Sequence, residues 1–241
     1  MKKFKIFKIF ILVFLFNLSL YGAEKLYVGT EAEFEPFEYM QDGKVVGFDI
    51  DLITEISKLI GRDIQIDAMK FDGLLPALQA KKIDIIIAGM TVTEERKNFV
   101  NFSDTYYTSE QMIVLNKEGN TEIKSFKDLP RKSVGVVLGY TADIIVSEIE
   151  GVNINRYNAT SEAIMALKAK KIDAIVFDSE PAKKYSSKNP ELLVLTTDAA
   201  KEEYAIALRK EDTQLLEEIN KALATLKTNG KYDELMKKYF D

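Results

Sequence analysis

The sequence predicts an α/β fold in which two similar units each carry a mainly parallel sheet flanked by helices. Short β-branched runs alternate with amphipathic helical stripes along the chain, the pattern of strands joined by helices. Residues 77–89 (ALQAKKIDIIIAG) are echoed at 166–178 (ALKAKKIDAIVFD), and each copy has the pattern of a helix end, a basic turn and a buried strand. The length of 241 residues suits two such units better than one. The alternative explanation of the repeat is convergence of two ordinary helix-to-strand turns.

The individual elements follow from hydrophobic periodicity and turn residues. A strand at 26–29 opens the first unit. A helix is predicted at 51–60, because its aliphatic residues share one helical stripe and Gly61 suits the position after a helix end. The same reasoning predicts a strand at 64–68, a helix at 74–80, strands at 83–88 and 134–137, helices at 142–149 and 161–169, and a strand at 172–176.

Residues 1–23 have the layout of a secretory signal peptide. Lysines at the start precede an apolar run at 9–16 and the small residues Gly22 and Ala23. The apolar run is shorter than the ~20 residues that span a bilayer. The chain has no cysteine to carry a lipid anchor. We therefore expect a periplasmic or secreted protein that is not a lipoprotein and does not insert into the membrane after cleavage.

Composition excludes several functional classes. With no His and no Cys, the chain cannot use Ser-His-Asp or Cys-His catalysis or build a structural zinc site. It has no Gly-rich phosphate loop of the GxxxxGK[ST] kind. Removing residues 1–23 removes four lysines and no acidic residue, which takes the net charge from -5 to about -9 and argues against nucleic-acid partners. We expect no catalytic residue, no metal and no cofactor.

The two copies of the repeat end in different chemistry. Ligands of open parallel sheets bind beyond the carboxyl ends of the strands. The first copy ends there in Ala88-Gly89-Met90-Thr91 and the second in Asp178. If the two units face each other, these groups oppose one another across a cleft.

Three segments in register carry a resemblance to a known family. They are 47–52 (GFDIDL), 88–96 (AGMTVTEER) and the closing 230–240 (GKYDELMKKYF). The mature chain resembles the periplasmic polar amino-acid-binding proteins of ABC importers, family 3 of the extracellular solute-binding proteins. This resemblance implies the type II periplasmic-binding-protein fold, with a ligand cleft between two lobes and crossing strands near 106–111 and 202–205. The implied division is 24–108 plus 204–241 for lobe 1 and 109–203 for lobe 2.

Arg96 is the predicted partner of the ligand carboxylate, since a guanidinium offers a bidentate fork. Thr91 and Glu94 fit a capping box, which would place Arg96 in a first helical turn where the macrodipole disfavours a cation. A role other than helix stability should therefore keep Arg96 there, although a plain surface arginine is the alternative. The resemblance implies that Thr91 and Thr141 assist it.

Asp178 is the predicted partner of the ligand ammonium, because it ends an apolar strand. The alternative is an N-cap before Pro181, and both roles can coexist. The resemblance implies that the main chain of Ala88 and Gly89 accepts the remaining ammonium protons. Met90 and Leu138 complete this part of the predicted ligand site.

The ligand side chain is expected to meet Glu31, Phe34 and Phe71. Both aromatic residues match pocket positions of the family, although core filling is the default for a phenylalanine. Glu31 with two aromatic rings could hold a guanidinium or ammonium through charge and cation-π attraction, which favours arginine or lysine. The alternative is that Glu31, Glu33 and Glu35 form a solvated acidic loop.

Other positions near the expected site carry further expectations. Within GFDIDL, we interpret Gly47 as a turn residue, Phe48 as core and Asp49 as a cap or turn residue without ligand contact. Positions around Tyr140, Ala142 and Phe177 depart from the histidine and glutamine patterns. Those two amino acids remain alternative ligands.

The predicted function is binding of a free amino acid by hinge closure and its delivery to an ABC permease, by a monomeric, non-enzymatic protein. A cyclohexadienyl or arogenate dehydratase on the same scaffold is the alternative from another class. Its substrate prephenate has no ammonium, which argues against it given Asp178. A receptor module would need transmembrane or signalling segments, and the sequence after the leader contains none.

Overall fold

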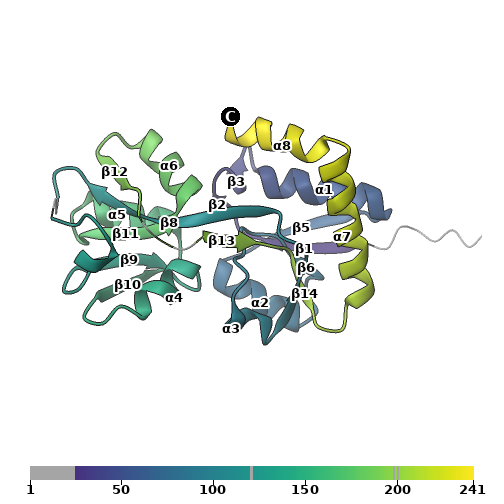
Figure 1. Cartoon of the computed structure of the whole chain (residues 1–241), viewed down its shortest axis with the longest axis horizontal. Helices are drawn as coiled ribbons and strands as arrows, with labels where there is room; N and C mark the ends of the chain where they lie inside the picture. The colour runs from purple at the N-terminus through teal and green to yellow at the C-terminus, as the bar shows by residue number, and fades with distance from the viewer. Residues whose placement is uncertain (1–24, 120–121, 198, 200) are drawn as a thin grey trace, which may run out of the picture.

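The computed structural model describes residues 25–119, 122–197, 199 and 201–241. The chain forms two α/β lobes lying side by side and bridged by one long and one short strand (Figure 1). The two-lobed α/β architecture predicted from the sequence is confirmed. The expected signal peptide at 1–23 lies outside the described residues. Among the residues that the structure describes, no helix is long and apolar enough to cross a membrane.

The first lobe is built on a five-stranded sheet with the order β5-β1-β6-β14-β7. Strands β1 and β5 pair in parallel, as do β1 and β6. A small antiparallel sheet, β2-β3-β4, lies beside it. The strands are β1 (Leu26–Thr30), β2 (Glu33–Phe34), β3 (Glu38–Gln41), β4 (Lys44–Val46), β5 (Ile64–Ala68), β6 (Ile85–Ile86), β7 (Val100–Phe102) and β14 (Ala207–Arg209). The helices are α1 (Phe48–Ile60), α2 (Phe71–Gln79), α3 (Glu94–Lys97), α7 (Thr213–Thr228) and α8 (Lys231–Phe240).

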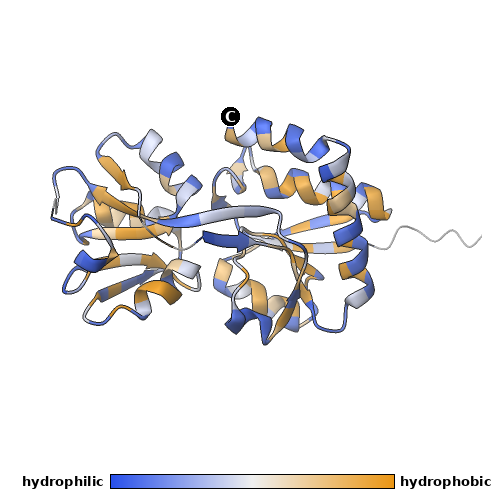
Figure 2. Ribbon diagram, in the orientation of Figure 1, coloured by the Kyte–Doolittle hydropathy of each residue, from blue (hydrophilic) through white to orange (hydrophobic). Residues whose placement is uncertain are grey.

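The second lobe repeats this plan with the strand order β10-β9-β11-β8-β12. Strand β9 pairs in parallel with both β10 and β11. The strands are β8 (Tyr107–Asn116), β9 (Ser133–Val137), β10 (Asn153–Tyr157), β11 (Ala174–Asp178) and β12 (Leu192–Leu195). The helices are α4 (Thr141–Ser147), α5 (Thr160–Lys168) and α6 (Ser179–Lys188), with the 3-10 turn η1 (Phe126–Asp128). In Figure 2 the central strands β9 and β11 are largely hydrophobic and the edge strand β10 is largely hydrophilic, while the helices alternate hydrophobic and hydrophilic residues.

Each sheet contains one reversed strand. Strand β14 is antiparallel to its neighbours β6 and β7, and β8 is antiparallel to β11 and β12. Both reversed strands belong to the segments through which the chain crosses between the lobes, so they enter each sheet from the opposite end. The sheets are therefore mainly parallel, as expected, with one exception that the connection explains.

The two copies of the sequence repeat adopt the same local structure. Lys81 and Lys170 both have φ of 57° in the turn after α2 and α5. The next amide binds back to the helix end in each copy, Lys82 to Ala77 O and Lys171 to Ala166 O, at 3.0 and 2.9 Å. The repeat thus delivers one strand to the centre of each lobe, β6 in the first and β11 in the second.

Two antiparallel strands cross between the lobes. Strand β13 (Lys201–Tyr204) pairs with the start of β8, with Tyr204 opposite Tyr107. These strands coincide with the crossing segments expected near 106–111 and 202–205. The lobe boundaries at 108/109 and 203/204 fall within them, and the exact division of the chain stays a prediction.

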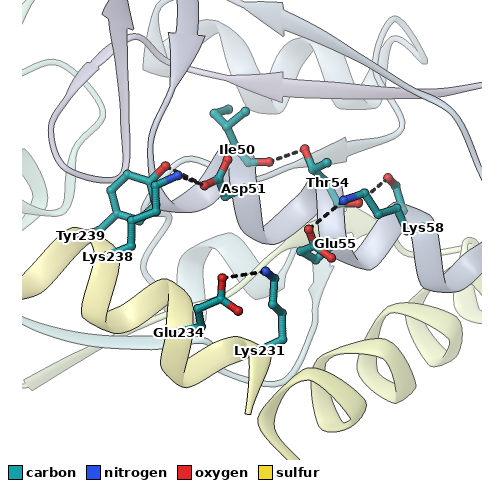
Figure 3. Close-up of polar contacts among 10 residues, drawn as sticks. Ile50, Asp51, Thr54, Glu55, Lys58, Lys231, Glu234, Lys238 and Tyr239 are labelled. Carbon is teal, nitrogen blue, oxygen red and sulfur yellow. Dashed lines mark hydrogen bonds and ion pairs between the residues drawn. The ribbon is translucent and has the colours of Figure 1, made fainter. Parts of the chain in front are cut away.

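The C-terminal helices return to the first lobe. Helix α8 packs beside α1 and α7 (Figure 1). Lys238 Nζ and Tyr239 Oη both donate to Asp51 Oδ2 of α1 at 2.7 Å (Figure 3). The first lobe therefore contains chain from both ends of the described sequence.

The element ends differ from the predictions in ways that concern the site. Helices α1 and α2 each begin three residues before the predicted start, at Phe48 and Phe71, because these buried rings extend the apolar stripe. Strand β6 spans 85–86 rather than 83–88, since the chain leaves the sheet to form a turn at Gly89 with φ of 52°. This turn lies at the centre of the candidate site.

Candidate functional site

A small cavity lies between the lobes, beyond the ends of β6 and β11. Its volume is about 10 Å³, which is room for roughly one water molecule. Both lobes contribute to its wall, and the lining residues are Phe34, Phe71, Ala88, Gly89, Tyr140, Thr141 and Asp178. Six of these seven belong to the predicted ligand site, and Tyr140 is the addition. In this conformation the lobes are closed onto each other.

Arg96 is buried and bridges the two lobes. It lies in α3, whose N-cap Thr93 accepts a hydrogen bond from the Arg96 amide at 3.2 Å. The guanidinium donates to Thr91 O at 2.7 Å in the first lobe. In the second lobe it donates to Gly139 O at 2.9 Å and Thr141 Oγ1 at 3.4 Å. The side chain is therefore not the plain surface arginine that the sequence left open.

The Arg96 charge has no ion-pair partner within 4 Å among the described residues. Only 4% of the residue is exposed, and burial lowers the pKa of the guanidinium to about 10, so it is cationic at neutral pH. Its ring neighbour is Phe71, with the guanidinium carbon 5.4 Å from the ring centroid. A buried cation held by carbonyl and hydroxyl oxygens alone is suited to receive a carboxylate.

The predicted capping box at Thr91 and Glu94 is wrong. The N-cap is Thr93, and Thr91 instead pairs with Tyr204 in a short β-bridge. The Thr91 hydroxyl donates to Glu202 Oε2 at 3.1 Å. Thr91 is therefore part of the hinge rather than of the helix start, because β13 passes alongside it. Helix α3 is a single turn whose last-turn cations are Arg96 and Lys97, so the predicted macrodipole penalty on Arg96 does not apply.

Asp178 ends β11 and faces the cavity with 3% exposure. Tyr204 Oη donates to Asp178 Oδ1 at 2.5 Å. Asp178 occupies the N-cap position of α6, yet its side chain makes no capping hydrogen bond. Burial raises the pKa of Asp178 to about 6, while hydrogen bonds from Tyr204 and Gln111 and the charge of Arg96 oppose the rise. The carboxylate is thus available to a ligand cation.

Three aromatic rings, Phe34, Phe71 and Tyr140, line the cavity, and a fourth, Phe177, packs against two of them to complete an aromatic box. Tyr140, from the second lobe, packs against Phe34 and Phe71 of the first lobe with centroid distances of 5.5 and 4.7 Å. Phe177 stacks on Tyr140 at 6.1 Å and meets Phe34 edge-on at 5.8 Å. Tyr140 and Phe177 were not predicted as site residues. Their positions directly after Gly139 and directly before Asp178 were the signal that could have found them.

Glu31 points into this box rather than into solvent. It is buried, and its Oε2 accepts a hydrogen bond from Tyr140 Oη. Its other oxygen has no hydrogen-bond partner among the residues described. Burial raises the pKa of Glu31 to about 7. The alternative of a solvated acidic loop is therefore wrong for Glu31.

Glu33 and Glu35 lie at the rim and contact the second lobe. Glu33 Oε2 accepts hydrogen bonds from the Ser161 amide at 3.1 Å and the Ser161 hydroxyl at 2.9 Å. Lys188 forms an ion pair with Glu35. Glu31 thus contacts the second lobe inside the cleft, whereas Glu33 and Glu35 contact it at the rim.

The turn at Gly89 is held from behind by Asp49. The Gly89 amide donates to Asp49 Oδ2 at 2.9 Å, and a Cβ on this glycine would lie 2.5 Å from Phe34 Cε1. Asp49 was expected to be a cap or turn residue. That expectation is wrong, because α1 begins at Phe48 without a side-chain cap and the Asp49 carboxylate turns toward Gly89. No local pattern in the chain signals this contact, which spans 40 residues.

Met90 and Leu138 lie beside the cavity rather than in its wall. Met90 is fully buried, and its carbonyl accepts the Ala205 amide at 3.1 Å. The Leu138 amide donates to Tyr157 O at 2.9 Å. Contact of either residue with a ligand stays a prediction.

Glu202 of β13 is a buried acid that was not predicted as a site residue. Its Oε2 accepts from Thr91 Oγ1 and Gln111 Nε2, both at 3.1 Å. Burial and then the charge of Asp178 raise its pKa to about 7. It therefore links both hinge strands to the turn that carries Thr91.

The chain is similar in sequence to known solute-binding proteins. Residues 26–241 match the family model of the bacterial extracellular solute-binding proteins, family 3. The chain is 38% identical to the arginine-binding extracellular protein ArtP of Bacillus subtilis, over 91% of this chain and 87% of the relative. It is 39% identical to a probable histidine-binding protein of Campylobacter jejuni, over 89% and 84% of the two chains.

A solved structure agrees in fold and sequence. An ancestral arginine-binding protein bound to arginine superposes with a TM-score of 0.87 at 45% identity, covering 90% of this chain and 98% of that one. All three of these relatives are named as binding proteins, which does not favour the dehydratase alternative.

Proposed function

Because the chain belongs to family 3 of the bacterial extracellular solute-binding proteins, we propose that it binds free arginine between its lobes and delivers it to the permease of an ABC importer. The family supports a site of action outside the cytoplasm. A signal peptide at 1–23 and a periplasmic or secreted, monomeric, non-enzymatic protein are part of the proposal.

One observation carries the proposal: two buried, opposite charges from different lobes lie near the same interlobe cavity, Asp178 in its wall and Arg96 in contact with the wall residues Phe71 and Thr141. Arg96 offers donors without a carboxylate partner, and Asp178 lines the cavity. An α-amino acid presents a carboxylate and an ammonium on one carbon, so it can satisfy both charges at once. Burial of a zwitterion is favourable only with such complete pairing.

Arginine fits the remaining part of the site. Its guanidinium would reach Glu31 and stack on the rings of Phe34, Phe71 and Tyr140, which combines charge with cation-π attraction. The Glu31 oxygen without a partner is an acceptor ready for this group. To admit arginine, the lobes must open and Tyr140 must move, because the cavity of about 10 Å³ is too small for an amino acid.

The contacts at the rim of the cleft support a mechanism in which ligand binding closes the two lobes. Glu33 and Glu35 bind Ser161 and Lys188 across the mouth of the cleft. Exposed ion pairs contribute about 0 to 1 kcal/mol, so these contacts guide closure and leave most of its energy to the ligand. Hinge bending at β8 and β13 would then convert occupancy into a shape that a permease reads.

A thermal-shift panel of the twenty amino acids tests the proposal. At a hundred times its dissociation constant, a bound ligand adds about 2.7 kcal/mol to the free energy of unfolding. Arginine should give the largest shift, with lysine and histidine next. A panel with no shift for any amino acid would contradict the proposed function. Prephenate incubated with the protein should show no change in absorbance.

Glu31→Gln is expected to reduce arginine affinity and to flatten its pH dependence. A cationic guanidinium favours the ionised Glu31, whose pKa without this partner is about 7. Arginine affinity in the wild type should therefore be greatest above pH 7 and fall as pH decreases below it, because binding must then release a proton. Calorimetric titrations between pH 5 and 8 measure this.

The Glu31→Gln variant isolates this part of the pH dependence, because the other buried acids remain. Its titration curve should be flatter than that of the wild type over the same range. Parallel curves for the two proteins would remove Glu31 from the guanidinium site. Glu118→Gln, a change of an exposed glutamate in the second lobe, is the matched control.

A further inference from the structure

Glu38 is a buried acid without an ordinary partner. It is the first residue of β3 and is 0% exposed. Neither of its carboxyl oxygens has a hydrogen-bond donor among the described residues. No described lysine or arginine forms an ion pair with it. An ionised carboxylate in such surroundings would be strongly destabilising, so the carboxyl group is expected to hold its proton.

Asp49 is the acceptor that a protonated Glu38 needs. The Asp49 amide donates to Phe37 O at 2.9 Å, and α1 packs against β3, which places Asp49 beside the residue next to Phe37, Glu38. A hydrogen bond between the two side chains contributes to the pKa of each. Asp49 Oδ2 already accepts the Gly89 amide at 2.9 Å and the Tyr106 hydroxyl at 2.8 Å. Asp49 Oδ1 has no donor other than this neighbouring acid among the described residues. A single shared proton therefore pairs one Glu38 oxygen with Asp49 Oδ1, and the second Glu38 oxygen keeps no donor among the described residues.

The negative charges around Glu38 and Asp49 disfavour loss of the proton that the two carboxyl groups would share. The pKa of Glu38 lies well above its usual range because of burial and the negative charges of Asp49 on α1, Glu31 after β1 and Asp178 on β11. Tyr106, before β8, is a neutral donor whose own pKa is raised well above its usual value. Burial also raises the pKa of Asp49, to about 6, while its hydrogen bonds oppose this.

We propose that Glu38 and Asp49 share one proton and act together as a positioning pair for the amino-acid site. Glu38 donates to Asp49, and Asp49 holds the Gly89 amide and so orients the Ala88–Gly89 turn against the cavity. The inference rests on the proposed function, in which this turn accepts protons from the ligand ammonium. Neither Glu38 nor Asp49 lines the cavity itself.

Two variants of Glu38 separate the shared proton from simple packing. Glu38→Gln keeps the shape and a permanent donor toward Asp49 but cannot ionise. Glu38→Met keeps the bulk and removes the donor. Glu118→Gln, in an exposed position, is the matched control.

The first measurement is the stability of the ligand-free protein between pH 5 and 8. A raised pKa in the folded state means that the native protein retains a proton that the unfolded chain loses above its ordinary pKa of about 4.5. The wild-type unfolding equilibrium should therefore shift toward the unfolded state as pH rises, by up to about tenfold per pH unit relative to Glu38→Gln. Parallel curves for wild type and Glu38→Gln would overturn the shared proton.

The second measurement is hydrogen exchange of the Gly89 amide, read by NMR without ligand. Glu38→Gln should retain its protection, and Glu38→Met should lose about tenfold or more relative to neighbouring amides of the first lobe. Unchanged protection in Glu38→Met would overturn the positioning role even if the proton is shared.

Arginine titration completes the test. Glu38→Gln should bind within about threefold of wild type, and Glu38→Met about tenfold or more weakly. Equal affinity in all three proteins would overturn the link to the ligand site. If wild type itself fails to bind arginine, the proposed function fails, whereas the pH and exchange measurements still decide whether the pair exists.

Discussion

Replacing Arg96 by alanine is expected to weaken arginine binding by about 2 to 5 kcal/mol, the cost of removing one member of a buried, hydrogen-bonded charge pair. The guanidinium is 4% exposed and bonds to both lobes, so its loss leaves the ligand carboxylate without its partner and removes an interlobe contact. Isothermal titration calorimetry of the variant measures the loss directly.

Further variants show whether the loss is specific. Arg96→Lys keeps the charge but not the bidentate fork, so its affinity should fall between wild type and Arg96→Ala. Arg62→Ala, in the first lobe where Arg62 pairs with Glu218 of α7, should bind like wild type. Agmatine, which lacks the carboxylate, should lose little affinity in Arg96→Ala. Near-native arginine affinity in Arg96→Ala would remove this residue from the site.

Replacing Asp178 by asparagine is expected to cost a similar 2 to 5 kcal/mol, about the range for one buried charge partner, by leaving the ligand ammonium without a counter-charge. Asparagine has nearly the same shape, and its oxygen can still accept the Tyr204 hydroxyl, so the fold should persist. Calorimetry with arginine and with 5-guanidinopentanoic acid, which lacks the ammonium, measures the effect.

The pair of ligands forms a double-mutant cycle with the substitution. Wild type should prefer arginine strongly, and the preference should nearly disappear in Asp178→Asn, because the variant lacks the group that contacts the ammonium. An unchanged preference would show that another acid, such as Glu202, binds the ammonium. Asp233→Asn, on the exposed side of α8, is the matched control.

Most of the fold could be predicted from local patterns. The repeat at 77–89 and 166–178 adopts one conformation in both lobes, down to the left-handed lysine in each turn. Periodicity located β1, β5, β6, β9 and β11 and helices α1, α2, α4 and α5, but it did not locate α6, the C-terminal helices α7 and α8 or the short strands β2–β4. It failed at the ends, where Phe48 and Phe71 extend their helices and where the chain leaves β6 early to form the Gly89 turn.

Some residues of the candidate site could likewise be predicted from the sequence, and others could not. Arg96 stood out in the sequence because a cation is unusual in the predicted first turn of a helix. Asp178 stood out because it ends an apolar strand whose carboxyl end was expected to face a cleft. The structure brings both to one interlobe region, although contact with a ligand stays a prediction. Tyr140 and Phe177 adjoin Gly139 and Asp178 in the chain, and this adjacency was the signal that could have found them. Glu202 and the Glu38–Asp49 pair could not be found, because their burial depends on contacts between separate elements.

The sequence by itself determined which groups stand near the ends of the central strands, because the extent of a buried strand follows from local hydrophobic pattern. Only the tertiary structure decided the order of the strands in each sheet. It alone also decided which acids are buried together and which face solvent. Glu31, Glu33 and Glu35 alternate in one short loop, yet the first is buried against Tyr140 and the others bind the rim of the second lobe. Burial and charge coupling depend on contacts between residues far apart in the chain, and no local pattern encodes them.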